Sequence, residues 1–122
     1  MSTSESIMNV TGIQTFVEKV RQRTDALEQG DSDTANALED DIEKAYLNIR
    51  ARGRSGQEWL LPLLEDLDLN VRAAAAAYVL DFEPDRALPV LEEIAAIPQG
   101  RFAGTDAELT LDVWRSGKYK IA

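Results

Sequence analysis

The stretch WLLPLLEDLDLNVRAAAAAYVLDFEPDRALPVLEEIAAI occupies residues 59–97 and decides the fold. It holds three segments in which apolar residues recur every three or four positions, the spacing that gathers them on one side of an α-helix. An acidic turn at residues 65–68 and a turn before Pro84 separate these segments. Because helices joined by short turns pack as antiparallel neighbours, this order predicts an all-α array of stacked helical hairpins.

The rest of the chain extends this pattern to about six helices and shows no strand periodicity. Ser/Thr-x-x-Glu/Gln pairs, in which a hydroxyl caps the first turn, predict helix starts at Thr11, Ser55 and Thr105. Helix ends are expected at glycines, which adopt the left-handed conformation without steric cost; these are Gly30, Gly53, Gly100 and Gly117. The expected helices cover about residues 12–29, 33–52, 56–65, 71–81, 84–97 and 106–116.

The apolar faces of these helices predict one core. Residues 73–80 are apolar nearly all round, which indicates a central helix packed on at least two sides. We expect a single domain over residues 11–122 and a disordered tail over residues 1–10, which are rich in serine. Trp59 and Trp114 are candidate partner anchors, but their apolar helix faces favour burial. The other expected core residues are Ile13, Phe16, Val17, Val20, Leu27, Leu38, Ile42, Ala45, Tyr46, Ile49, Leu60, Leu63 and Leu64.

Composition excludes several kinds of chemistry. The 122 residues include no cysteine and no histidine, which removes disulfides, thiolate nucleophiles, imidazole bases and most zinc sites. A net charge of -9 disfavours nucleic acid and anionic membranes as partners and favours basic proteins. The first residues have no signal-peptide pattern and the apolar runs are too short to span a bilayer, so we expect a cytoplasmic protein.

The acidic stretch at residues 39–43 is a candidate metal site. Its Asp and Glu side chains recur within one turn of an expected helix, where like charges repel and normally face water. Carboxylate metal clusters in helical bundles generally recruit histidine as well, and the chain has none. We therefore predict a solvated face, no metal and no cofactor.

Three arginines form a basic cluster in an otherwise acidic chain. Arg50, Arg52 and Arg54 lie near the end of an expected helix and suit an acidic partner or a phosphate. Helix C-termini also attract cations, since the helix macrodipole stabilises each by about 0.3–1 kcal/mol. We favour this structural interpretation, and the cluster remains part of the candidate interaction surface.

Two further arginines complete that candidate surface, Arg72 and Arg115. Arg72 stands at the start of the alanine-rich helix, directly after the acidic turn. We expect its planar guanidinium to pair with the carboxylate of Asp66 or Asp68 and to hold neighbouring helices together.

Several motifs carry a resemblance to known proteins. The acidic turn with Asp66 and Asp68, followed by Val71-Arg72 and small residues, resembles the HEAT-repeat class, in particular its short phycobilisome-lyase-like variety. The segments YLNIRARG at 46–53 and AELTLDVWRSG at 107–117 are similar to a small prokaryotic family of uncharacterised HEAT-like proteins. The resemblance implies a short right-handed α-solenoid of about six antiparallel helices and implies no activity.

The leading functional hypothesis is a non-enzymatic protein-interaction module with a basic partner. Stacked hairpins present a continuous side-chain surface that suits recognition, and neutralisation of a toxin or effector is one specialisation. One alternative is an enzyme or enzyme accessory related to HEAT-like lyases or DNA-repair glycosylases, although an acidic chain lacks the basic groove that DNA requires. The other alternative is a self-assembling structural unit such as a homodimer, because a short array leaves apolar ends that need covering.

Overall fold

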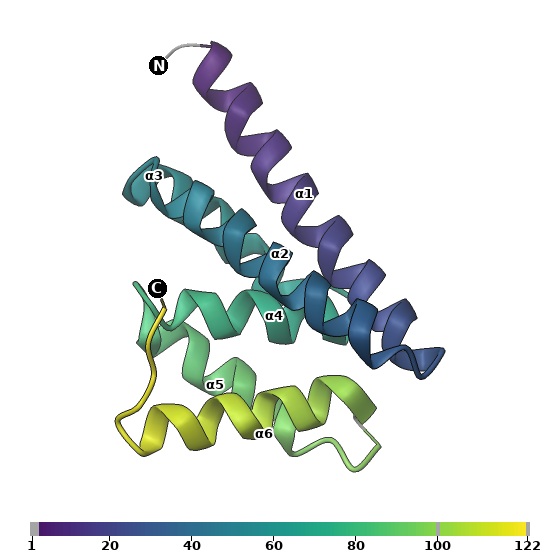
Figure 1. The fold of residues 1–122 in the computed structure, drawn as a ribbon. Helices are drawn as coiled ribbons and strands as arrows, with labels where there is room; N and C mark the ends of the chain where they lie inside the picture. The colour runs from purple at the N-terminus through teal and green to yellow at the C-terminus, as the bar shows by residue number, and fades with distance from the viewer. Residues whose placement is uncertain (1–2, 100, 122) are drawn as a thin grey trace. The chain divides into compact units, whose positions relative to one another are not determined.

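A computed structural model describes residues 3–99 and 101–121, with the backbone alone at residues 3–6 and 8. Figure 1 shows these residues as helices and connecting loops, and no strand occurs among them. The predicted all-α class is therefore confirmed for this part of the chain. The chain divides into two compact units, residues 1–60 and residues 61–122, where the sequence predicted one domain over residues 11–122.

In the first unit, α1 (Thr3–Glu28) and α2 (Ser32–Arg50) pack side by side as an antiparallel hairpin (Figure 1), and the one-turn α3 (Arg54–Gln57) follows. The hairpin turns at Gly30, whose φ of 72° suits glycine. All five core residues predicted for α2 are buried, whereas α1 buries Phe16 and Val20 but leaves the other three partly exposed. The buried residues of α2 are Ala35, Leu38, Ile42, Ala45, Tyr46 and Ile49.

Asp31 caps the start of α2. Its carboxylate accepts hydrogen bonds from the backbone amide of Thr34 at 3.1 Å and from the Thr34 hydroxyl at 2.6 Å. The hydroxyl first, and the amide second, lower the pKa of Asp31 from its usual value of 3.8, because both donors favour the charged form. The cap therefore satisfies one of the amides that a helix start leaves without an internal partner.

Helix α1 begins at Thr3, where the sequence expected a disordered tail over residues 1–10 and a helix from about Gly12. The serine-rich opening lacks apolar periodicity, so its local pattern gives no sign of a helix. A long-range contact is present instead: the side chain of Asn9 is 5% exposed, and its Oδ1 accepts a 3.5 Å hydrogen bond from Nη1 of Arg52. Packing of this kind stabilises helical turns that propensity alone leaves marginal.

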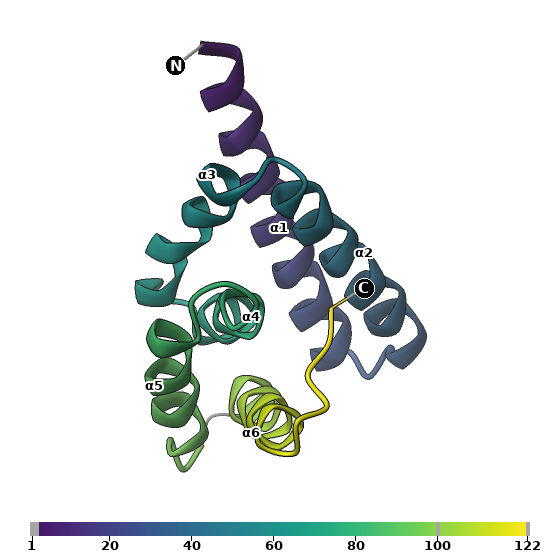
Figure 2. The ribbon, with the colours of Figure 1, turned by 90° about the vertical axis from the view of Figure 1, so that its left-hand side faces the viewer.

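Three helices form the second unit: α4 (Leu69–Val79), α5 (Pro84–Ala95) and α6 (Arg101–Arg115). Each packs against the other two, and Figure 2 looks nearly along α4 and α6 with α5 beside them. The predicted packing of the alanine-rich helix on two sides is confirmed within this unit, because α4 contacts both α5 and α6. Its fully buried residues are small or β-branched, which lets the backbones approach closely: Val71, Ala75, Ala76 and Val79.

Residues 58–65 form a 3₁₀ helix, η1, where the sequence predicted one α-helix over residues 56–65. Pro62 lies inside this segment and disfavours an α-helix, because it has no N–H for the carbonyl of Glu58 and its ring crowds that carbonyl. The different winding leaves Trp59 37% exposed, so its predicted burial was wrong. Leu60 and Leu64 are buried as predicted, and Leu63 is half-buried.

The helix starts predicted at Thr11 and Thr105 were wrong, because both residues lie inside helices, where the same residue pair also occurs as ordinary neighbours on one face. The start predicted at Ser55 is one residue from the observed one, since α3 begins at Arg54, but its N-cap is Gly53 and no side chain caps it. The glycine signals performed better: Gly30, Gly53 and Gly117 have positive φ after a helix, and Gly100 lies outside the described residues. Glycines therefore located the helix ends in this chain more accurately than Ser/Thr pairs located the helix starts.

The C-terminal segment after α6 folds back within the second unit. The hydroxyl of Tyr119 donates a hydrogen bond to the carbonyl of Ala77, in the last turn of α4. The ring of Tyr119 meets that of Trp114 edge to face, with centroids 5.3 Å apart and planes at 70°. Trp114 is half-buried, so the burial predicted for it is only partial. The Tyr119 hydroxyl therefore bonds one of the carbonyls at the end of α4, which have no amide partner within the helix.

Among the described residues, no helix combines the length and the apolar character that crossing a bilayer requires.

Candidate functional site

The five predicted surface arginines are divided between the two units. Arg50, Arg52 and Arg54 belong to the first unit, whereas Arg72 and Arg115 belong to the second. The cluster in the first unit is tied to its neighbours by side-chain contacts. The guanidinium carbon of Arg50 lies 6.0 Å from the centroid of the Tyr46 ring, within cation–π range.

Side-chain hydrogen bonds also hold Arg52 and the end of α2 to neighbouring residues. Arg52 donates to buried Asn9, and the Tyr46 hydroxyl accepts a 3.0 Å hydrogen bond from the side-chain amide of Gln57. The cluster follows the last turn of α2, where the helix macrodipole favours cations. Arg54 is exposed and also has a partner. These contacts support the structural interpretation of the cluster.

Arg72 has a structural role, but its bonding partner differs from the predicted one. Its Nε and Nη2 donate hydrogen bonds of 3.0 and 2.8 Å to the backbone carbonyl oxygen of Asp66, where the sequence predicted a carboxylate. The carboxylates serve the turn: Oδ1 of Asp66 accepts from the amide of Asp68 at 2.8 Å, and Oδ1 of Asp68 accepts from the amide of Asn70 at 2.9 Å. The acidic residues thus shape the turn, and the arginine fastens it to α4.

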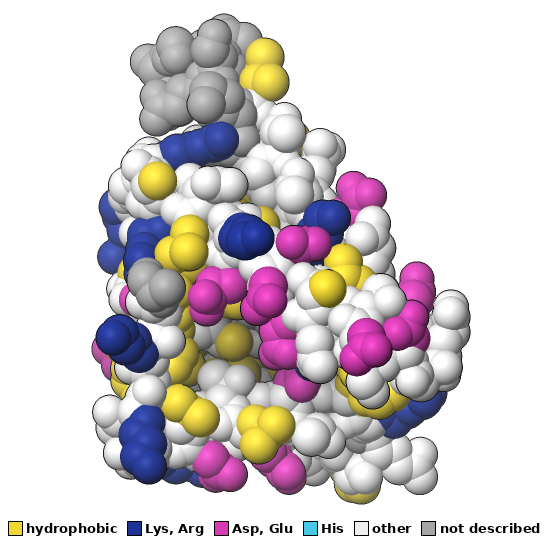
Figure 3. All heavy atoms as spheres, in the orientation of Figure 1, with side chains coloured by type: hydrophobic (Ala, Val, Ile, Leu, Met, Phe, Trp, Pro, Cys, Tyr) yellow, Lys and Arg dark blue, Asp and Glu magenta, His cyan; other side chains and the backbone are white. Residues whose placement is uncertain are grey.

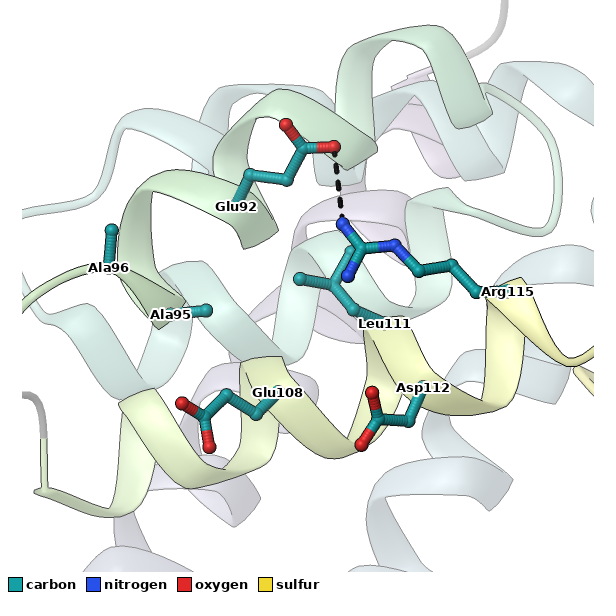
Figure 4. A pocket seen from close by; sticks show the side chains of 7 residues that line it. All are labelled: Glu92, Ala95, Ala96, Glu108, Leu111, Asp112 and Arg115. Atoms are coloured by element: carbon teal, nitrogen blue, oxygen red, sulfur yellow. Dashed lines mark ion pairs between the residues drawn. The ribbon is translucent and has the colours of Figure 1, made fainter.

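Arg115 borders a groove between α5 and α6, with a volume of about 530 Å³. Figure 4 shows that Glu92 and Arg115 extend toward each other from the two helices, while Glu108 and Asp112 project from α6. Three carboxylates and one guanidinium therefore line the groove. Its remaining lining residues are small or apolar: Ala95, Ala96 and Leu111.

The groove has an apolar floor and a charged rim. Leu111 is 3% exposed, so its side chain forms a fixed base, whereas Glu92, Glu108 and Asp112 are exposed. Glu108 and Asp112 lie one helical turn apart, a spacing at which like charges repel. This arrangement favours a cation that sits between them and lays its apolar stem on the floor.

Arg115 supplies one internal cation to this rim. Its Nη2 lies 3.7 Å from Oε1 of Glu92, and the two side chains are 60% and 58% exposed. Exposed ion pairs of this kind contribute only about 0–1 kcal/mol, because water screens them and two long side chains must be ordered. Two carboxylates of the groove, those of Glu108 and Asp112, stand outside this ion pair.

Charges of both signs are mixed on one face of the molecule. The face drawn in Figure 3 carries acidic, basic and apolar side chains side by side.

The acidic stretch of α2 faces solvent in part, where the sequence predicted a solvated face, because Asp41 and Glu43 are half-buried. Glu39 and Asp40 are exposed, and Asp41 pairs with Lys19 of α1 at 3.8 Å. Within residues 3–99 and 101–121, no group of three or more Asp or Glu side chains is arranged to hold a metal ion.

A second hollow, of about 460 Å³, follows one face of α1. Ile13 and Val17 supply its apolar part, and Glu18, Arg21 and Asp25 supply charges of both signs. Further along the same helix, Ile7 is 60% exposed and Val10 is 39% exposed. This face holds no concentration of one charge.

The sequence did not predict the groove residues Glu92, Glu108 and Asp112. A partial signal was present, because Glu108 and Asp112 are separated by four residues and share a helix face. The approach of Glu92 from α5 depends on tertiary packing, which the local pattern does not contain.

The fold is similar to that in the crystal structure of the protein RPA1889 from Rhodopseudomonas palustris CGA009. The TM-score is 0.80 at 26% sequence identity, and the match covers 92% of each chain. Neither a protein-family model nor a curated protein matches the sequence. The comparison thus supports the helical fold and bears on no activity.

Proposed function

We propose that this protein is a non-enzymatic interaction module that binds a basic segment of another protein in the groove between α5 and α6. The observation that carries the proposal is the set of three carboxylates, Glu92, Glu108 and Asp112, around the apolar floor at Leu111. Neither cysteine nor histidine stands anywhere in the sequence to supply a thiol or imidazole for catalysis.

The chemistry of the groove suits long cationic side chains. The stem of an arginine or lysine packs on Ala95, Ala96 and Leu111, and its charged head reaches the carboxylates of the rim. The net charge of -9 adds a long-range attraction that raises the rate of association with a basic protein.

The proposal includes the architecture suggested by the family resemblance. We propose that the helices stack as a short right-handed HEAT-like solenoid and that the protein works in the cytoplasm. The mutual packing of α4, α5 and α6 and the acidic turn before α4 support the stacking. Neutralisation of a basic toxin or effector is the specialisation that matches an acidic groove of this size.

Self-assembly is the second candidate function. Apolar residues that α1 leaves exposed or half-buried favour it, since a homodimer would cover Ile7, Val10 and Val17. Sedimentation equilibrium distinguishes the two candidates, because self-assembly predicts a concentration-dependent mass and a module for a foreign partner predicts a monomer. An enzyme related to lyases or glycosylases has less support, because the α5–α6 groove is acidic and DNA requires basic side chains.

The proposal is tested by affinity capture from the native cell with three forms of the protein. The first is the wild type, the second carries Glu108→Gln with Asp112→Asn, and the third carries Glu39→Gln with Asp40→Asn. The second and third forms each lose two negative charges. The second loses them from the groove, and the third loses them from the exposed residues Glu39 and Asp40 of α2. A basic partner that the groove variant loses and the α2 variant retains supports the proposal. Equal loss from both variants, or capture of no partner by the wild type, overturns it.

A further inference from the structure

We propose that Arg115 is an internal occupant of the α5–α6 groove, and that an arginine of the basic partner binds by displacing it from Glu92. This inference rests on the proposed function and specifies the group that the groove recognises. It assigns to Arg115 the role of a competitor that weakens binding.

The geometry places a guanidinium in the groove already. Arg115 is the last residue of α6, and Figure 4 shows its side chain reaching across the groove to Glu92 on α5. The ion pair between Arg115 and Glu92 is therefore the same interaction that a partner's arginine would make with Glu92. Glu108 and Asp112 continue the carboxylate row along α6 beside this position.

The ion pair is loose enough to exchange. Its N–O distance of 3.7 Å exceeds the roughly 2.7–2.9 Å of a charge-assisted hydrogen bond, and both side chains are more than half exposed. The chain leaves the helix directly after Arg115 and turns at Gly117, whose φ is 75°. After displacement from Glu92, the Arg115 side chain can therefore extend into solvent.

The chemistry favours arginine over lysine in the incoming segment. A guanidinium presents a planar fork that bonds a carboxylate at two points, whereas an ammonium acts as a single charge. A partner's arginine that takes the place of Arg115 meets Glu92 with this fork, and Glu108 and Asp112 line the same groove.

The test titrates the full-length protein with two eight-residue peptides, one alternating arginine with glycine and the other alternating lysine with glycine. Binding is measured by calorimetry at low and at moderate salt. We expect Arg115→Ala to tighten binding of the arginine peptide by about two- to fivefold, the scale of an exposed ion pair. The arginine peptide is expected to bind more tightly than the lysine peptide.

The matched control is Arg86→Ala on α5, which removes the same charge from an exposed position outside the groove lining. The inference is overturned if Arg86→Ala tightens binding as much as Arg115→Ala, or if Arg115→Ala has no effect. Glu108→Gln with Asp112→Asn separates this failure from that of the proposed function. If that double variant weakens binding but Arg115→Ala does not tighten it, only the displacement is wrong. If neither change alters binding, the groove is not the binding site.

Discussion

The guanidinium of Arg72 donates two hydrogen bonds to a single acceptor, the backbone carbonyl oxygen of Asp66. A carbonyl is present whatever side chain stands at position 66. The turn before α4 is therefore held by the arginine and the backbone, while the carboxylate of Asp66 has the separate task of accepting from the amide of Asp68.

This relationship predicts an unequal response to two substitutions. Arg72→Ala removes both bonds to the carbonyl and should lower the free energy of unfolding by about 1.5–3 kcal/mol, the range for hydrogen bonds to charged groups. Asp66→Asn keeps the carbonyl and the Oδ1 acceptor, so we expect a change below about 0.5 kcal/mol. Urea unfolding measures both values. Equal, large losses would mean that an ion pair with the Asp66 carboxylate holds the turn.

A close backbone approach at Gly56 predicts a strong effect of one methyl group. A Cβ at this position would lie 2.6 Å from the carbonyl oxygen of Ile49 and 3.0 Å from Cβ of Arg52, so backbone must move. Gly56→Ala should destabilise the protein by about 1–3 kcal/mol.

Gly12→Ala is the matched control for this change. Its Cβ would meet Cγ1 of Ile49 at 3.4 Å, an ordinary contact, in the interior of α1. Because alanine favours helix more than glycine does, we expect stabilisation of up to about 1 kcal/mol. Thermal melts of both variants check the pair, and a stable Gly56→Ala protein would contradict the close approach of α3 to α2.

The dense packing of α4 predicts intolerance to added volume. Ala75 and Ala76 are fully buried, so Ala76→Leu should cost on the order of 1–3 kcal/mol through overpacking. Asp41→Ala on α2 breaks only a 3.8 Å pair with Lys19 near the surface, and should cost less than about 1 kcal/mol. Chemical unfolding of both variants makes the comparison, and equally small effects would remove α4 from the core.

The cap at Asp31 predicts a pH-dependent contribution to stability. Its pKa is lowered in the folded state by the hydroxyl and then the amide of Thr34, so the folded protein binds its proton less tightly than the unfolded chain does. The contribution is therefore complete above the unfolded value near 3.8 and is lost as the pH falls through the lower folded value. The stability difference between wild type and Asp31→Ala should be constant near neutrality and shrink below about pH 4. If the stability difference between wild type and Asp31→Ala grew as the pH fell, the pKa of Asp31 would be raised in the folded state, contrary to this account.

Local patterns predicted the helical class and most helix positions, because apolar periodicity and left-handed glycines act within a few residues of chain. They failed at the start of α1, where Asn9 contacts the distant Arg52, and at η1, where Pro62 lies inside a 3₁₀ helix.

The candidate site was less predictable than the fold. Five arginines were the predicted interaction surface, yet Arg52 and Arg72 bond groups of their own chain. Acidic residues are common here, so no single one is conspicuous. The groove arises only when packing of α5 on α6 brings Glu92 near Arg115, and that pairing has no trace in local spacing.

The central claim is that the α5–α6 groove receives a cationic side chain, and NMR of the isotopically labelled protein tests it most directly. The backbone amide signals are followed while the arginine–glycine peptide is added. We predict that the largest shifts fall on Ala95, Ala96 and Leu111, with smaller changes along the rest of α6. Shifts concentrated on the acidic face of α2 at residues 39–43, or scattered without a maximum at the groove, would contradict the claim.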